Sequence, residues 1–307
     1  METKANDAIG AGSHALPPEE IDPLIATRIP FRWLGVILLL AVLTVLGGGI
    51  WFYQYQERRM EQEIAQQLRA LGELKVEQIT CWRAERLGDA GLLCEDPFLI
   101  AEIARWARSP QAAASRNLLR FLRSLQRHYH YRDILLVDSQ GRVGLSLSGQ
   151  RGPLDREGRQ ALATAFRQGR AVLTDLHLAP DGRTPHLAAI APLRQEGGEG
   201  RMVGALVLQC DGRQFLYPLI QSWPTASRTA ETLPVRKDGD SLLFLNDLRH
   251  LPDTALRLRL PLSRQELPAV QAVLGREGIV RGRDYRGGEA LAFLKAVPDS
   301  PWFMVAK

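Results

Sequence analysis

The first strong feature of the hydrophobic pattern is an apolar run near the N-terminus, Leu34–Phe52, which contains no charged residue. About 20 apolar residues cross a hydrocarbon core as a helix, so this run is long enough to span a bilayer. Aromatic residues gather at its far end, where an interfacial belt is expected: Trp51, Phe52, Tyr53 and Tyr55. We therefore predict a transmembrane helix over residues 31–53.

A cleaved signal peptide is the alternative interpretation of this run. It is disfavoured because a long segment precedes the run and because Met1 is not followed by a basic and hydrophobic signal. Residues 1–30 contain Pro17-Pro18 and show neither a helical nor a strand period, which predicts a disordered cytoplasmic leader. Arginines flank the apolar run on both sides, so charge alone does not orient the span.

A helical period continues after the apolar run. Apolar residues recur three and four positions apart with charged residues between them: Ile64, Leu68, Leu71, Ile79, Trp82 and Leu87. This spacing predicts a long stalk helix over residues 54–110 that packs along the domain that follows. Its apolar stripe also favours parallel pairing with a second copy, so we expect a homodimer.

Beyond residue 110 the pattern predicts a mixed lobe over residues 111–218. A helix at Leu118–Gln126 precedes a strand at Asp133–Asp138, and Gly141 then supplies the positive φ of a tight turn into a second strand. A helix at Leu154–Gln168 follows, and three further apolar runs complete an antiparallel sheet: Ala171–Leu178, His186–Leu193 and Met202–Cys210.

Residues 219–307 repeat the same plan. A connecting helix at Phe215–Trp223 leads to strands at Glu231–Arg236 and Ser241–Leu245 around a second Gly-containing turn. A helix at Ser263–Leu274 and three strands follow: Ile279–Tyr285, Ala290–Val297 and Trp302–Ala306. The order strand, turn, strand, helix and three strands therefore occurs twice, at a spacing of about 100 residues, as a structural repeat without sequence identity.

Composition and charge narrow the classes of function. Hydrophobic residues make up 45% of the chain and charged residues 24%, a balance typical of a globular protein. The net charge of +5 arises from basic residues interleaved with 34 acidic ones, which indicates a solvated surface and no nucleic-acid partner. Cys81, Cys94 and Cys210 show no metal-ligand spacing, so we expect three unpaired thiols.

The sequence contains no catalytic signature. A P-loop, a nucleophile elbow, a zincin motif and the nucleotide motifs of kinases are all missing. A hydrolase using His177, His186 and Asp175 would lack a nucleophile motif. We therefore assign no catalytic residue and no cofactor.

The most informative polar set is Asp175, His177 and His186. If residues 180–182 centre a hairpin, the register places His177 opposite His186, and Asp175 shares their face. Two imidazoles and a carboxylate on one face could bind an anionic small molecule or a metal. The simpler interpretation is half-exposed strand residues beside a pocket. We assign the three residues as ligand contacts and assign no metal.

A second polar cluster precedes the first strand and contains Tyr129, Tyr131 and Arg132. We assign these three residues as ligand contacts. The alternative is that they cap a helix-to-strand turn on the surface.

The whole pattern resembles the double Cache sensor region of bacterial transmembrane sensor histidine kinases. The motifs that carry the resemblance are Asp133–Val143 in the first lobe and, in the second, Trp223–Leu233, Asp238–Asp240, Phe244–His250, Asp284–Gly287 and Pro298–Lys307. The resemblance implies an α+β fold in which the transmembrane and stalk helices precede two tandem PAS-like lobes, antiparallel sheets with helices. It further implies that the 111–218 lobe is membrane-distal and the 219–307 lobe membrane-proximal.

The resemblance also predicts the function: an extracytoplasmic sensor at the cell inner membrane that binds a small molecule in the distal lobe. The parent receptor would be a histidine kinase, and a diguanylate cyclase or a chemoreceptor is the alternative. Such a receptor has a second span and an output domain after the sensor, so we expect the sequence to be a truncated piece of it. A non-catalytic envelope adaptor without a ligand is a further alternative.

Overall fold

The computed structural model describes residues 31–108, 113–194, 202–223, 227 and 229–307. The predicted leader, residues 1–30, lies outside the described residues. The chain divides into two units, residues 1–59 and residues 60–307. In the first unit, helix α1 (Phe31–Glu95) begins with the apolar run, whose 18-residue window has a mean hydropathy of 2.4 and no buried residue. It is long and apolar enough to cross a membrane.

The helical region after the apolar run is two helices and not one. Helix α1 ends at Glu95, and α2 (Pro97–Arg108) begins directly afterwards. The Asp96 carboxylate accepts hydrogen bonds from the backbone N–H groups of Phe98, at 2.8 Å, and Leu99, at 3.2 Å, and Pro97 occupies the first helical position. An N-cap followed by proline is a helix start, so the single stalk helix predicted for residues 54–110 is wrong beyond Glu95.

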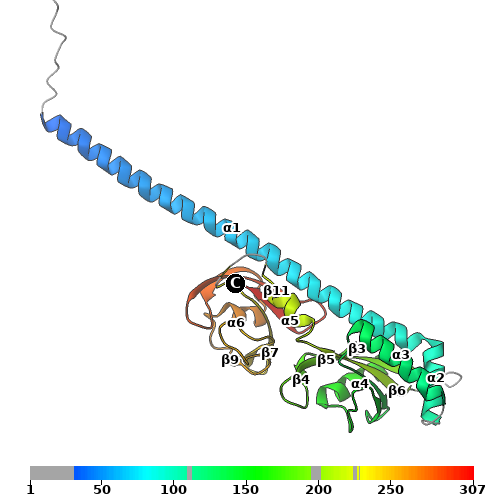
Figure 1. The fold of residues 1–307 in the computed structure, drawn as a ribbon. Coiled ribbons are helices and arrows are strands. Elements are labelled where there is room, and N and C mark those ends of the chain that lie inside the picture. The colour runs from blue at the N-terminus through cyan, green and yellow to red at the C-terminus, as the bar shows by residue number, and fades with distance from the viewer. Residues whose placement is uncertain (1–30, 109–112, 195–201, 224–226, 228) are drawn as a thin grey trace, which may run out of the picture. The chain divides into compact units, whose positions relative to one another are not determined.

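The first lobe consists of one antiparallel sheet between helices (Figure 1). Helix α3 (Ala113–Tyr129) leads into the hairpin of β1 (Asp133–Asp138) and β2 (Val143–Ser146), and α4 (Arg156–Gln168) follows. The remaining strands are β3 (Val172–Leu173), β4 (His177–Leu178), β5 (Pro185–Arg194) and β6 (Met202–Asp211). The strand order is β2-β1-β6-β5-β3, with β4 also pairing β5, so the strand predicted at Ala171–Leu178 forms two short pieces.

The two faces of this sheet have separate cores. Ile134, Leu136 and Leu187 face α1, α2 and α3, whereas the alternate residues Leu135 and Ala188 face α4. This alternation follows from the period of two along a strand. In β1, β5 and β6, successive residues therefore face opposite sides of the sheet: one packs against α1, α2 and α3, and the next packs against α4.

The second lobe repeats the sheet order. Helix α5 (Leu216–Gln221) connects it to the first lobe, and its elements are β7 (Thr232–Asp238), β8 (Ser241–Phe244), β9 (Arg259–Pro261), α6 (Pro268–Val273), β10 (Gly278–Arg283), β11 (Glu289–Ala296) and β12 (Trp302–Ala306). The order is β10-β11-β12-β7-β8-β9. Read from β8 to β10 it reproduces the first sheet, with β9 as an addition that the sequence pattern did not predict. The predicted α+β fold with two tandem PAS-like lobes is confirmed.

From Met60 onward, α1 packs against both lobes (Figure 1). Gly72 allows the helix to approach the ring of Phe293 in β11, since a Cβ there would lie 2.4 Å from a ring carbon. Ile79 joins the main core, and the guanidinium of Arg83 lies 4.9 Å from the centre of the Trp302 ring. Leu68, Leu71 and Ile79 are buried within the chain itself. Most of the stripe expected to form a dimer is thus covered by the chain's own lobes, and the homodimer stays a prediction.

The central strand β6 contains a position where only glycine fits, and this generates a prediction. A Cβ on Gly204 would lie 2.3 Å from the backbone oxygen of Val137, so Gly204→Ala must displace the ladder between β1 and β6. We expect it to lower the free energy of unfolding by about 1–3 kcal/mol. Gly88→Ala, on an exposed part of α1 with no neighbour within 4 Å, should raise it by about 0.5–1 kcal/mol. Urea unfolding of both variants measures the contrast, and equal effects would contradict it.

Candidate functional site

A short hairpin between β4 and β5 brings two histidines together. The Asp181 carboxylate accepts hydrogen bonds from the backbone N–H groups of Arg183, at 2.8 Å, and Thr184, at 2.9 Å, and Gly182 supplies a φ of 64°. These features fix the turn, and the ladder then pairs His177 with His186, as the sequence register predicted. The two imidazole rings meet edge to face with 4.2 Å between their centres.

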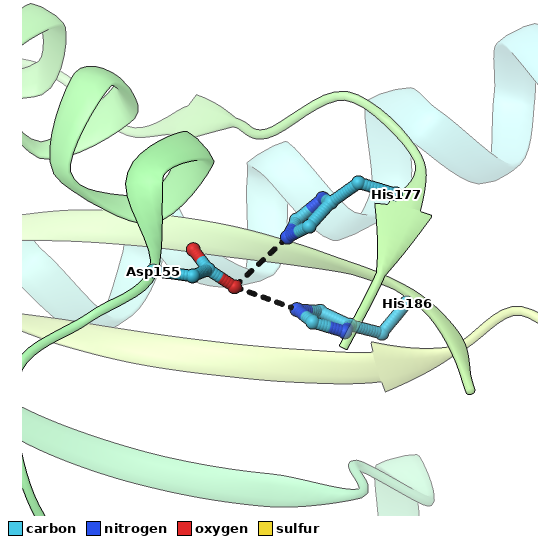
Figure 2. Close-up of side chains that lie close together, drawn as sticks. All are labelled: Asp155, His177 and His186. Carbon is cyan, nitrogen blue, oxygen red and sulfur yellow. Dashed lines mark hydrogen bonds and ion pairs between the residues drawn. The ribbon is translucent and has the colours of Figure 1, made fainter. Parts of the chain in front are cut away.

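The carboxylate that meets both imidazoles is Asp155. It is the N-cap of α4, where its Oδ1 accepts the backbone N–H of Gly158 at 2.7 Å. Its other oxygen, Oδ2, lies 2.9 Å from Nε2 of His177 and 3.4 Å from Nε2 of His186 (Figure 2). Helix capping therefore leaves one oxygen of Asp155 free and aims it at the two rings.

Burial and hydrogen bonding act in opposite directions on this cluster. Burial raises the pKa of the Asp155 carboxyl, but hydrogen bonds from His177, His186 and the Gly158 N–H outweigh it and bring the pKa well below the ordinary value. Burial lowers the pKa of His177, and the bonds to the Asp155 carboxylate and to the Asp175 main chain outweigh it, so the net pKa is raised. Both shifts favour a carboxylate beside a cation.

The tautomer of His177 is fixed by its other ring nitrogen. Nδ1 lies 2.8 Å from the carbonyl oxygen of Asp175, and because a carbonyl can only accept, Nδ1 carries a hydrogen. In a neutral ring Nε2 then presents a lone pair to the Asp155 carboxylate, which is repulsive. A proton or a metal ion is therefore required between Nε2 and Oδ2.

His186 is more deeply buried than His177. Its exposed fraction is 2%, and Nδ1 has no hydrogen-bond partner among the described residues. The ring's polar contact runs through Nε2 to Asp155. Within the described ranges, Asp155, His177 and His186 are the one set of three His, Cys, Asp or Glu residues placed to hold a metal, with all donor atoms within 4.8 Å of one another.

Asp175, predicted to share the face of the histidines, instead joins the two lobes. Its carboxylate accepts the indole N–H of Trp302 at 2.6 Å and forms an ion pair with Arg236. Trp302 is completely buried, and the Arg236 guanidinium also donates to the carbonyl of Leu176 at 3.2 Å. The chain between β3 and β4 leaves the regular ladder here, so the period of two used for the prediction does not hold at Asp175.

The second predicted cluster is divided between two places. Tyr131 is buried on the α1 side of the sheet, where its hydroxyl donates to the Asp89 carboxylate at 3.2 Å, and Tyr129 stacks on it with 6.0 Å between ring centres. Arg132 forms an exposed ion pair of 3.4 Å with Asp181 in the β4–β5 turn. None of the three touches the cluster of Asp155, His177 and His186 through a described contact, and their role in ligand binding remains a prediction.

Asp133 and Gln209 are further polar side chains on the α4 face that the pattern did not reveal. Asp133 is buried and accepts hydrogen bonds from the hydroxyls of Ser146, at 2.6 Å, and Ser148, at 2.5 Å, and from two backbone N–H groups of that segment. Gln209 bonds to Gln150 at 3.3 Å. The sequence did contain a signal for these two residues, because each is a polar residue in an otherwise apolar strand. Their hydrogen-bond partners follow only from the fold.

No protein-family model matches the sequence, and no curated protein matches it. Solved structures do match. The ligand-binding domain of the Pseudomonas fluorescens chemoreceptor CtaA, in complex with L-serine, is 16% identical with a TM-score of 0.53, over 80% of this chain and 97% of that one. The extracellular domain described as that of a histidine kinase, vpHK1S-Z8, is 17% identical with a TM-score of 0.53, over 81% of this chain and 91% of that one.

A third similar structure comes from a protein of a different description. A domain of a sensory box/GGDEF family protein from Vibrio parahaemolyticus is 17% identical with a TM-score of 0.51, over 80% of this chain and 94% of that one. At these identities the similarity establishes the fold. The chain has the fold of the ligand-binding domains of chemoreceptors and sensor kinases, in agreement with the predicted double Cache architecture.

The double use of Asp155 generates a prediction. Asp155→Asn keeps an oxygen that can cap α4, whereas Asp155→Ala removes both the cap and the contact with the imidazoles. Loss of an N-cap costs about 1 kcal/mol, so Asp155→Ala should unfold more readily than Asp155→Asn by about that amount. Urea unfolding followed by circular dichroism measures the difference. Equal stability of the two variants would show that capping by Asp155 contributes nothing.

Proposed function

We propose that this chain is the sensing part of a membrane-bound bacterial signalling receptor and that it binds a small molecule in its first lobe. The observation that supports this most directly is the pair of lobes with the same sheet order, packed on one helix that begins with an apolar segment. Two of the similar solved structures are the ligand-binding domain of a chemoreceptor and an extracellular domain described as that of a histidine kinase.

The proposed binding region is the α4 face of the first-lobe sheet, at the N-terminus of α4. Asp155, His177 and His186 come from three different elements and converge there, and a cluster of this kind is unnecessary for packing alone. Buried polar groups with shifted pKa values mark functional sites more often than chance. A ligand that changes the spacing of these elements can report its own binding to the rest of the fold.

The route that we propose runs from His177 to the second lobe through Asp175. The His177 ring donates to the Asp175 main chain, and the Asp175 side chain holds Trp302 at the start of β12. A ligand shifts such an equilibrium only by its difference in affinity for the two states. Couplings of this type amount to about 1–3 kcal/mol.

We further propose that the sensor lobes are extracytoplasmic at the inner membrane and that the parent receptor is a histidine kinase, on the strength of the second-lobe motifs. Cys81 is a free, exposed thiol, so a membrane-impermeant maleimide should label it in spheroplasts, and protection there would contradict the assigned side. Sequencing the gene beyond the Lys307 codon tests the type of parent receptor. A cyclase or chemoreceptor domain there would contradict the histidine kinase, and a stop codon would contradict a receptor.

Ligand binding is the central test of the function. We expect a screen of amino acids and other small metabolites against the chain in detergent micelles to find a compound that raises the melting temperature and is not chemically converted. At 100 times its dissociation constant such a ligand stabilises the native state by about 2.7 kcal/mol. His186→Ala should weaken binding, while the exposed His250→Ala should leave it unchanged. A compound that is turned over would indicate an enzyme, and the absence of any shift would favour an adaptor.

The link between the lobes predicts the behaviour of Asp175→Ala. This change leaves the buried indole N–H of Trp302 without its acceptor and removes the carboxylate that pairs with Arg236, which should cost about 1–3 kcal/mol of folding free energy. A ligand of the first lobe should still bind, but it should no longer slow hydrogen exchange in β12. The exposed Asp240→Ala is the matched control. Unchanged protection of β12 in Asp175→Ala would exclude this route.

A further inference from the structure

Asp155, His177 and His186 have the composition and spacing of a transition-metal site. We propose that they bind a single divalent ion of the zinc class through Oδ2 of Asp155 and Nε2 of each histidine. This inference deepens the proposed function by naming a ligand class for the same region, and it rests on that function only for the ion's role, not for its binding.

Two of the three donor separations are close to what such an ion requires, and all three donor atoms lie within 4.8 Å of one another. Ligand atoms about 2.0–2.1 Å from a tetrahedral zinc ion are separated from one another by about 3.3 Å. Here the separations from Oδ2 to the two Nε2 atoms are 2.9 Å and 3.4 Å (Figure 2). The three side chains come from the N-cap of α4, from β4 and from β5, and both imidazoles approach the same carboxylate oxygen of Asp155 (Figure 2).

The ligand atoms are also held in the orientation that metal binding needs. The Nδ1 hydrogen of His177 is bonded to the Asp175 carbonyl, so Nε2 is the nitrogen free for a metal. Oδ1 of Asp155 is bonded to the Gly158 N–H, so Oδ2 is the free oxygen. A buried lone pair facing a carboxylate needs a cation between them, and a metal ion with imidazole and carboxylate ligands satisfies both groups.

The donor set restricts the metal. Calcium and magnesium prefer sites built from oxygen, and two imidazole nitrogens count against both ions. No cysteine lies in the cluster, so a thiolate site for copper(I) does not arise. Two histidines and one carboxylate suit zinc, nickel, cobalt or iron(II), and they leave at least one coordination position for water or for a small molecule.

An ion in this place would fasten the β3–β4 segment to α4. Asp175, which holds Trp302 and Arg236, lies two residues before His177 in that segment. Occupancy of the site would therefore reduce the freedom of the segment that connects the two lobes.

The test uses the whole chain in detergent micelles, stripped of metal with a chelator and then titrated with zinc, and with cobalt as a spectroscopic probe. We expect one ion per chain by elemental analysis, a higher melting temperature with zinc, and cobalt absorption bands of a nitrogen and oxygen site. His177→Ala and His186→Ala should each weaken zinc binding by more than the roughly 10–100-fold that loss of an outer contact costs. The exposed His128→Ala and His250→Ala are the matched controls and should bind as the wild type does.

Asp155→Asn keeps the helix cap and so serves if a histidine variant fails to fold; it should lose the same affinity. Zinc bound no more tightly by the wild type than by Asp155→Asn or His186→Ala would overturn the inference. A small molecule that stabilises the metal-free wild type fully, with no zinc bound, would overturn the metal site and leave the sensor function standing. Zinc bound at these residues, with no small molecule that stabilises the chain, would support the metal site and count against the small-molecule ligand.

Discussion

The carboxylate of Asp175 is the contact on which the relation between the two lobes depends. It accepts the indole N–H of a fully buried tryptophan and pairs with an arginine, and both partners belong to the second lobe. The Asp175 carboxylate is half-buried, and the fully buried indole N–H of Trp302 needs an acceptor. Each lobe thus supplies what the other would otherwise leave unsatisfied.

The carboxylate of Asp155 makes two different contacts in the first lobe. One oxygen completes the first turn of α4 and the other faces two imidazoles, so the start of a helix and the position of a polar cluster are set by the same side chain. The positive end of the helix dipole favours an ionised Asp155. The ionised carboxylate of Asp155 therefore requires a neighbouring cation, which is either an imidazolium or a metal ion.

The features that the sequence predicted are those set by local rules. The pairing of His177 with His186 follows from a turn and a period of two, and the repeated order of elements follows from alternating periods. Asp155 was missed because its partners are 22 residues or more away in sequence, and only the packing of α4 on the sheet brings them together. The available signal was an aspartate directly before a helical run, which is an N-cap pattern.

The remaining differences also have physical causes. The stalk helix was extended too far because its helical period continues past Asp96-Pro97, although that pair is itself a start signal. The apolar stripe of the stalk also predicts a dimer surface, and the homodimer stays a prediction because a stripe does not say which partner covers it. In this fold Leu68 and Ile79 are covered by the second lobe and by the main core.

Lys75 shows a mechanical consequence of this packing. It is 3% exposed, and its ammonium group lies 2.5 Å from the carbonyl oxygen of Leu219 and 2.6 Å from the hydroxyl of Ser222, at the end of α5. Burial lowers the pKa of this ammonium group, yet the two acceptors hold it at the negative end of a helix dipole. The connector between the lobes is thereby pinned to α1. Because α5 connects the two lobes and is bonded to α1, any rotation of one lobe relative to the other must also move α1.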